Sequence, residues 1–230
     1  MQLFHIFVVA SAVFFSANGQ VSVTQAEFEA GVMTNGYPKP TSAQYQGFVN
    51  SLSAGTITSK MEAAMFLAQT LHESAGLTTK REWGCSGQNG CADRYPAWSE
   101  WVAECQGSNR PSGVSYYGRG YLQLTWCSNY IQASRALGKG DTLKTNPDSV
   151  PQTEDLSWGV SAWFWKVNVH SALGGTNEFG RTTKAINGQT QECQGNGQNA
   201  DKSRQRYAYY TKVFAAFRIS GTPNEAGCPY

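Results

Sequence analysis

The sequence predicts a mainly helical protein built as a single domain. Several segments of 10 to 18 residues carry apolar side chains at helical spacing, and they outnumber the segments with the alternation of strands. We find no internal repeat, low-complexity tract or long linker among the 230 residues. Once an N-terminal leader is set aside, about 210 residues remain, which is enough for one sizeable hydrophobic core.

The leader is residues 1–19, which contain no Lys, Arg, Asp or Glu. Their apolar stretch is shorter than the ~20 residues that a membrane span needs. It gives way to the small residues Ser16, Ala17, Asn18 and Gly19, as at a signal-peptide cleavage site. We therefore predict a signal peptide over 1–19, a single secreted domain over 20–230, and no membrane-spanning segment.

The elements of the domain follow from local patterns. Thr24 and Glu27 have the spacing of a capping box, which predicts a helix after Thr24. Further helices are expected over 41–52, 60–74, 128–137, 156–167 and 200–217, and Gly76 suits the end of the helix 60–74. Residues 182–187 start another element before a polar, Gly-rich stretch. Residues 78–115 are rich in Gly, Ser, Asn, Cys and Trp, which predicts an irregular lobe with short strands or turns, pinned by disulfides.

Charge and cysteine usage narrow the function classes. The net charge is +2, without a run of Lys or Arg, which argues against nucleic-acid binding. Six cysteines in a secreted chain predict three disulfides, although spacing leaves fifteen pairings open. A Cys193–Cys228 bond would tie the C-terminal tail to the body. A zinc site is the alternative, but none of the three His lies near a cysteine, so we expect no metal or cofactor.

Two glutamates are the best candidates for catalysis, because motifs for zinc proteases, serine hydrolases and nucleotide binding are absent. Glu73 lies at the end of an apolar helix, where low dielectric and the helix dipole should raise the pKa of its carboxyl group. Glu82 follows Lys80 and Arg81, whose charges favour its ionised form. Such a pair suits cleavage of a glycosidic bond. The alternative is a solvated helix end and a surface salt bridge.

A set of ordered motifs resembles the plant-type and streptomycete-type chitinases of glycoside hydrolase family 19. The resemblance extends from about Ser59 to Cys228. It rests on AAMFLAQTLHES at 63–74, YYGRGYLQLT at 116–125, NY at 129–130, ALG at 136–138, NPD at 146–148, AWFW at 162–165, FGRTT at 179–183, ING at 186–188, EC at 192–193 and RYAYY at 206–210. The family's catalytic acid corresponds to Glu73. The short interval to Glu82 is similar to that of the bacterial members, whose second glutamate is the base.

The resemblance implies a lysozyme-like α+β fold with two helical lobes around a substrate cleft. It also implies an endochitinase acting on chitin or chitooligosaccharides by an inverting mechanism, and we expect the protein to be a monomer. The implied site consists of Glu73 as acid, Glu82 as base, Thr125 positioning the water, and Tyr116, Gln123, Asn129 and Asn187 binding substrate. Glu192 and Arg206 would support the acid, with Arg204 as the alternative arginine.

Three departures from the family pattern stand out. Ser128 replaces a sugar-contacting Tyr. Cys127 replaces an Asn and is expected to enter a disulfide, with Cys105 as one candidate partner, and Cys85 and Cys91 complete the set of six cysteines. The segment 189–191 is one residue longer than usual. Both carboxylates are retained, so the sequence favours a chitinase over two alternatives, a peptidoglycan-cleaving muramidase-like hydrolase and a non-catalytic chitin-binding protein.

Overall fold

The computed structural model describes residues 21–95, 103–106, 109, 111–187, 192–194 and 197–229. The predicted signal peptide, 1–19, lies outside the described residues. Among the residues that are described, no helix is both long enough and apolar enough to cross a membrane.

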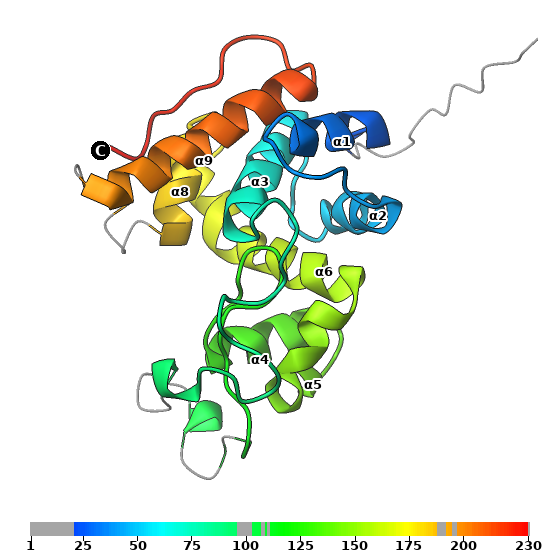
Figure 1. Cartoon of the computed structure of the whole chain (residues 1–230), viewed down its shortest axis with the longest axis vertical. Coiled ribbons are helices and arrows are strands. Elements are labelled where there is room, and N and C mark those ends of the chain that lie inside the picture. The colour runs from blue at the N-terminus through cyan, green and yellow to red at the C-terminus, as the bar shows by residue number, and fades with distance from the viewer. Residues whose placement is uncertain are drawn as a thin grey trace, which may run out of the picture.

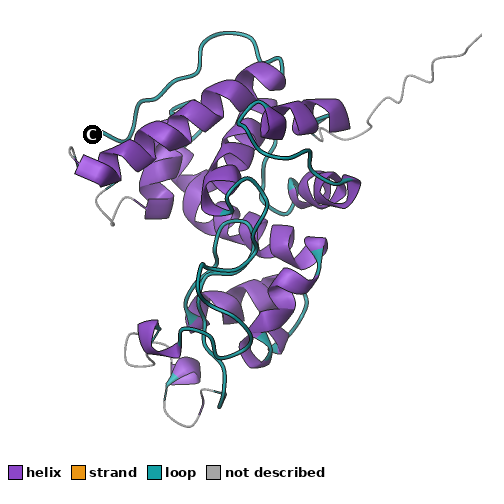
Figure 2. Ribbon diagram, in the orientation of Figure 1, coloured by secondary structure: helices purple, strands orange, loops and turns teal. Residues whose placement is uncertain are grey.

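Helices dominate the structure, as the sequence predicts (Figures 1 and 2). The α-helices are α1 (Gln25–Met33), α2 (Ser42–Ser51), α3 (Lys60–Glu73), α4 (Cys127–Ala136), α5 (Thr142–Thr145), α6 (Glu154–Phe164), α7 (Ser171–Leu173), α8 (Phe179–Asn187) and α9 (Gly197–Ala216). Short 3-10 helices cover η1 (Ala92–Arg94), η3 (Ala103–Cys105) and η5 (Pro147–Gln152), and η6 (Trp165–His170) is a π-helix.

Local chemistry fixes the boundaries of the first three helices. Thr24 forms the predicted capping box with Glu27, and Thr41 forms a second one with Gln44. Helix α3 ends at Glu73, three residues before the chain turns through Gly76 at a φ of +72°. A side chain at Gly76 would lie 2.0 Å from the ring of Tyr37, so this turn requires glycine.

Two hydrophobic cores share helix α6. The first core holds Phe28, Phe48, Phe66, Trp158 and Phe217 among others, and it lies where α1, α2, α3 and α9 pack together. The second core holds Tyr116, Leu124, Tyr130 and Trp163 among others, beside α4 and α5. In Figure 1, α6 runs between these upper and lower parts. All residues of α6 from Ser157 to Trp163 are buried, so different faces of this helix contact the two cores.

The predicted helix 156–167 changes character before its expected end. Helix α6 stops at Phe164, and the chain continues as the π-helix η6. The buried carboxylate of Glu62 accepts a hydrogen bond from Trp165 Nε1 at 2.9 Å and contacts His170 Nδ1 at 2.7 Å. These partners are five residues apart, the hydrogen-bonding period of a π-helix. Glu62 on α3 therefore contacts both ends of the π-helix.

The predicted irregular lobe contains turns, 3-10 helices and isolated β-bridges over its described residues. The bridges pair Arg81 with Arg119 and Arg119 with Leu124. Three disulfides join Cys85 to Cys91, Cys105 to Cys127 and Cys193 to Cys228. The last two are pairings that the sequence suggested. The fold class is confirmed: a mainly helical, two-part molecule with a small disulfide-pinned irregular region.

Candidate active site

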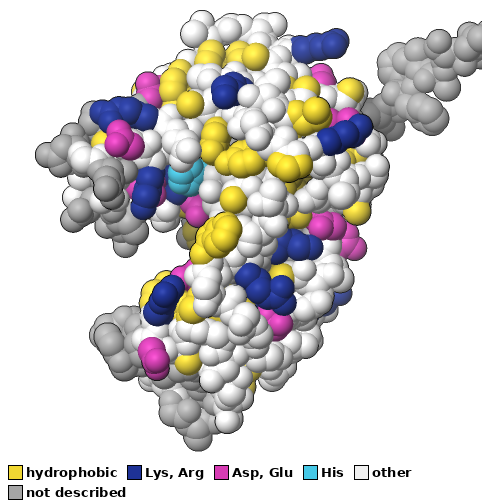
Figure 3. All heavy atoms as spheres, in the orientation of Figure 1, with side chains coloured by type: hydrophobic (Ala, Val, Ile, Leu, Met, Phe, Trp, Pro, Cys, Tyr) yellow, Lys and Arg dark blue, Asp and Glu magenta, His cyan; other side chains and the backbone are white. Residues whose placement is uncertain are grey.

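A cleft of about 910 Å³ lies between the upper and lower parts of the molecule. The surface is visibly hollowed there on the left side of Figure 3. The cleft is lined by Glu73, Glu82, Trp83, Arg94, Gly118, Leu122, Gln123, Thr125, Trp126, Asn129, Phe164, Lys184, Ala185, Ile186 and Asn187. Both candidate carboxylates therefore border one cavity, although they come from different lobes.

Glu73 is presented to the cleft by the last residue of α3. Its side chain is 15% exposed, and its Oε1 lies 2.5 Å from Arg206 Nη2. Asn187, at the end of α8, donates from Nδ2 to the same Oε1 at 3.4 Å. Among the described residues, both contacts of this carboxylate are made by one oxygen. The family resemblance named Arg206 as a support of the acid, and the structure places its guanidinium directly on the Glu73 carboxylate.

Behind Glu73 lies a buried ionic network centred on Arg206, on α9. Arg206 binds Glu192 through Nε at 2.8 Å and through Nη2 at 3.2 Å. Its Nη1 donates to Gln69 Oε1 at 2.7 Å, and Gln69 in turn donates to the hydroxyl groups of Thr182 and Thr183. Arg206 and Glu192 are almost fully buried. The network thus joins α3, α8 and α9 directly behind the carboxylate.

The geometry also decides which arginine contacts Glu73. The side chain of Arg204 is 54% exposed and binds Asp201 at 2.8 Å, one helical turn away. Arg206 is the residue that reaches both Glu73 and Glu192.

His72 adds a neutral group beside this network. Burial, followed by the positive charges of Arg206 and Lys202, lowers the pKa of His72 to about 3. The imidazole is therefore uncharged at neutral and mildly acidic pH. His72 lies near Tyr209 on α9, with ring centroids 6.1 Å apart.

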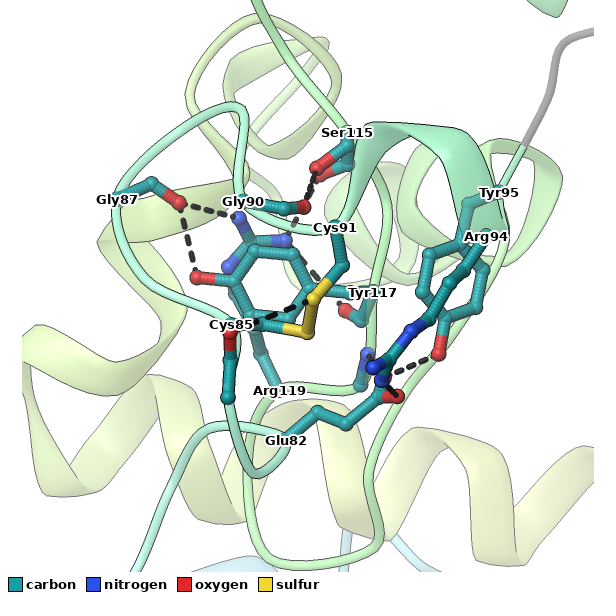
Figure 4. The surroundings of a disulfide bond; sticks show 12 residues. Glu82, Cys85, Gly87, Gly90, Cys91, Arg94, Tyr95, Ser115, Tyr117 and Arg119 are labelled. Atoms are coloured by element: carbon teal, nitrogen blue, oxygen red, sulfur yellow. Dashed lines mark hydrogen bonds and ion pairs between the residues drawn. A yellow bond between two sulfur atoms is a disulfide. The ribbon is translucent and has the colours of Figure 1, made fainter.

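Glu82 is held by contacts different from those expected from the sequence. Its Oε2 accepts a hydrogen bond from the hydroxyl group of Tyr95 and another from the backbone N–H of Gly118 at 3.1 Å. Its Oε1 lies 3.4 Å from Arg94 Nη1. Figure 4 shows Arg94 and Tyr95 both directed at the Glu82 carboxylate.

The two cations that precede Glu82 in the sequence pair with other carboxylates. Lys80 binds Glu154 at 3.0 Å, and Arg81 binds Asp148 at 3.0 Å. Burial raises the pKa of Asp148, but Arg81 and buried Arg119 outweigh it and leave this pKa below its ordinary value. The expectation that Lys80 and Arg81 serve Glu82 was wrong. Long side chains pair with the carboxylates that the fold places beside them, so closeness in the sequence to Glu82 does not decide the partners of Lys80 and Arg81.

Four of the predicted substrate or water residues line the cleft: Gln123, Thr125, Asn129 and Asn187. Thr125 Oγ1 donates to the carbonyl of Gln123 at 2.8 Å, and Asn129 Nδ2 donates to the carbonyl of Thr125 at 2.8 Å. Gln123 adopts a positive φ of 52°, and its Nε2 donates to Gly120 O at 2.9 Å. These contacts form one local cluster on the lower wall of the cleft.

Tyr116 does not reach the cleft, so its predicted contact with a sugar has to be corrected. Its side chain is buried in the second core, with 2% of the residue exposed. Its hydroxyl group donates to the carbonyl of Lys144 at 2.9 Å, and its ring packs against Tyr130. Burial in this core makes Tyr116 a support for the lower wall.

Several cleft residues were not assigned a role from the sequence. Trp83 is 78% exposed and directly follows Glu82, and Trp126 precedes the helix α4 with a φ of 77°. Arg94, Tyr95 and Lys184 also lie at or behind the cleft wall. The high aromatic content was compatible with sugar stacking, but which Trp residues stay exposed depends on the tertiary structure. In the described part of the chain, no cluster of three or more His, Cys, Asp or Glu side chains could hold a metal.

The chain is similar to several known proteins. A family model for glycoside hydrolase family 19, described as "Chitinase class I", matches residues 39–174. "Acidic endochitinase SP2" of Beta vulgaris is 38% identical over 170 residues, which are 72% of this chain and 52% of that protein. The chain thus spans about half the length of that relative.

Two solved structures are also similar. Chitinase C from Streptomyces griseus HUT6037 aligns with a TM-score of 0.67 and 29% identity, over 93% of this chain and 100% of that one. A family GH19, class IV chitinase from Zea mays aligns with a TM-score of 0.63 and 25% identity, over 88% and 96% of the two chains.

Proposed function

The chain belongs to glycoside hydrolase family 19, and from this premise we propose that it is an endochitinase. It hydrolyses β-1,4 linkages between N-acetylglucosamine units of chitin or chitooligosaccharides, with inversion at the anomeric carbon. The observation that carries the proposal is that Glu73 and Glu82 border the same cleft and have different hydrogen-bond partners.

Glu73 is the general acid in this proposal. Arg206 and Asn187 both donate to its Oε1, so the acidic proton belongs on Oε2, which delivers it to the leaving glycosidic oxygen. Glu82 is the general base and takes a proton from the water that attacks the opposite face of the sugar. An inverting enzyme needs its carboxyl groups roughly 6.5–9.5 Å apart, or somewhat more, to admit that water. Two carboxylates facing one cleft from separate lobes suit this requirement.

The surrounding residues have supporting roles in the same mechanism. Thr125 positions the attacking water, while Gln123, Asn129 and Asn187 bind the sugar or its N-acetyl group; all four line the cleft. Glu192 and Arg206 orient Glu73 through the buried network. Three disulfides suit an oxidising compartment, which supports secretion. We propose that residues 1–19 are the signal peptide and that 20–230 form a single catalytic domain. We propose that this domain acts as a monomer.

The test is cleavage of a chitin hexamer by the purified protein, followed by chromatography. We expect shorter oligomers from the wild type and at least about 10²-fold less product from Glu73→Gln, which retains the shape but not the proton. No cleavage by the wild type, or equal cleavage by Glu73→Gln, would refute the proposal. A parallel assay with bacterial cell wall tests the muramidase alternative, because faster release from peptidoglycan than from chitin would favour it.

A further inference from the structure

The two carboxylate oxygens of Glu82 differ in their hydrogen bonding, because the acceptor sites of one oxygen, Oε2, are filled. Oε2 accepts from both Tyr95 and the Gly118 N–H, and a carboxylate oxygen has about two acceptor sites. Oε1 is contacted by one group of the described chain, Arg94 at 3.4 Å, which is a long contact from a 62% exposed side chain. Only Oε1 therefore has acceptor capacity left for a proton from water.

Tyr95 reaches Glu82 without lining the cleft. It is absent from the cleft wall, whereas Glu82 and Arg94 belong to it. Its ring packs edge-on against Trp126, a wall residue, with centroids 5.3 Å apart. The hydroxyl group therefore reaches the carboxylate from outside the cleft, while Trp126 fixes the ring.

A covalent ring holds Tyr95 in this place. We name residues 82–95 the base loop; its two ends meet at the hydrogen bond between Tyr95 and Glu82 (Figure 4). The Cys85–Cys91 disulfide closes the middle of the loop, and Cys91 is followed directly by η1 and then Tyr95. The bond thus links the segment that carries Glu82 to the segment that carries its hydrogen-bond donor.

The base loop is also anchored to the core through its carbonyl groups. Gly87 O accepts hydrogen bonds from Arg119 Nη2 at 3.1 Å and from the Tyr117 hydroxyl at 2.8 Å. Gln88 O accepts from the backbone N–H of Ser115 at 2.8 Å, and Gly90 O accepts from the Ser115 hydroxyl. Arg119 is completely buried, so its contact with Gly87 is a fixed point.

We propose that Tyr95 is a positioning residue for Glu82, that the Cys85–Cys91 disulfide keeps it in place, and that Oε1 is the oxygen that receives the proton from the attacking water. The inference rests on the proposed function of Glu82 as base. The proton moves from water to Oε1, the hydroxide oxygen bonds to the anomeric carbon, and the glycosidic oxygen leaves with the proton of Glu73. Tyr95 keeps its own proton throughout.

The first test compares Tyr95→Phe with Tyr45→Phe. Tyr45 is a matched control, because its hydroxyl group donates to the carbonyl of Val23 at 2.9 Å, outside the cleft. With chitin hexamer, we expect Tyr95→Phe to lower kcat about tenfold, with KM changed less than about twofold, since a hydrogen bond to a charged group is lost. The acidic limb of its pH profile should move to higher pH. The Tyr95 hydroxyl group stabilises the ionised carboxylate, and this stabilisation is lost in the variant. Tyr45→Phe should leave kcat, KM and the profile at wild-type values.

A second readout does not depend on activity. The side-chain carboxyl carbon of Glu82 is followed by NMR during a pH titration and assigned by its disappearance in Glu82→Gln. A midpoint that moves to higher pH in Tyr95→Phe but not in Tyr45→Phe supports the positioning role, even if the wild type fails to cleave chitin and the proposed function falls. An unchanged midpoint and unchanged kcat in Tyr95→Phe would overturn the inference while leaving the proposed function intact.

The disulfide is tested by the double variant Cys85→Ser/Cys91→Ser. The disulfide and the Tyr95 hydroxyl group are proposed to act through the same contact with Glu82. When Tyr95→Phe is combined with the double serine variant, the total fold-decrease in kcat should therefore be smaller than the product of the two separate fold-decreases. Multiplicative losses would show that the disulfide does not act through Tyr95, and would overturn that part of the inference.

Discussion

Glu73 and Glu82 border one cleft, but they are held by different kinds of structure. Glu73 sits on a helix, in front of a buried ionic network that joins α3, α8 and α9. Glu82 sits on the base loop, which has little regular structure and depends on a disulfide and on backbone contacts to Arg119. The helical lobe builds its site from packing and buried charge, whereas the irregular lobe builds its site from covalent and backbone ties. The same type of substitution near Glu73 and near Glu82 should therefore have different effects on activity and on stability.

The largest effect on activity is expected from the two carboxylates themselves. Glu73→Gln and Glu82→Gln should each lower kcat by about 10²- to 10⁴-fold, because each removes a proton-transfer group. Their melting temperatures should stay close to that of the wild type, as measured by circular dichroism. A variant that keeps more than about a tenth of the wild-type kcat would remove that residue from the mechanism.

The next contrast lies between the two arginines. Arg206→Met leaves buried Glu192 and Glu73 without their cation, which should lower the free energy of unfolding by about 3–5 kcal/mol. Arg94→Met removes an exposed cation and should lower it by at most about 1 kcal/mol. Guanidinium unfolding of both variants measures the difference. Equal losses in the free energy of unfolding would mean that the buried network around Arg206 contributes no more to stability than the exposed contact of Arg94.

The disulfides offer a second matched pair. Cys193–Cys228 lies beside Glu192 and closes 35 residues, whereas Cys85–Cys91 closes six. On chain entropy alone, replacing each pair by serine should lower the free energy of unfolding by about 4 and about 2 kcal/mol, respectively. We expect replacement of Cys85–Cys91 to lower kcat more than replacement of Cys193–Cys228 does, although it lowers the free energy of unfolding less. Thermal melts together with hexamer assays of both variants test this order, and a reversed order of stability would contradict it.

The effect expected to be smallest at neutral pH is a pH dependence of stability on the acid side. The pKa of His72 is near 3 in the folded protein and near 6.5 when unfolded, so the unfolded chain binds the proton more readily below pH 6.5. Stability from this residue is therefore complete above pH 6.5 and is lost as the pH falls towards 3, by about 2 kcal/mol at pH 5. His72→Gln should lose correspondingly less stability between pH 7 and 5 in denaturant titrations. An identical pH dependence would show that His72 is not the responsible group.

The sequence predicted the helical lobe better than the irregular one, for physical reasons. Capping boxes at Thr24 and Thr41 and the apolar spacing of α3 act within a few residues, so they are visible in the sequence. The π-helix was not predictable, because its widened turn faces Glu62 on a distant helix. Short elements such as α5 and η5 carry too few residues to show a period.

The same division holds for the candidate site. Glu73 and Arg206 were found through motifs on long helices, and the structure brings them into contact. The partners of Glu82 were assigned to Lys80 and Arg81 by adjacency, whereas Arg94 and Tyr95 approach through a loop closed by Cys85–Cys91. That pairing was one of fifteen that the six cysteines allow, so the contacts that depend on it could not be derived from spacing.

The central claim is that the two carboxylates act as acid and base on opposite faces of one sugar. Proton NMR of the first products from chitin hexamer tests it most directly, because the anomers can be read before they equilibrate. The account predicts that new reducing ends appear first as the α-anomer, inverted relative to the β-linked substrate. Initial release of the β-anomer would mean retention of configuration and would contradict it.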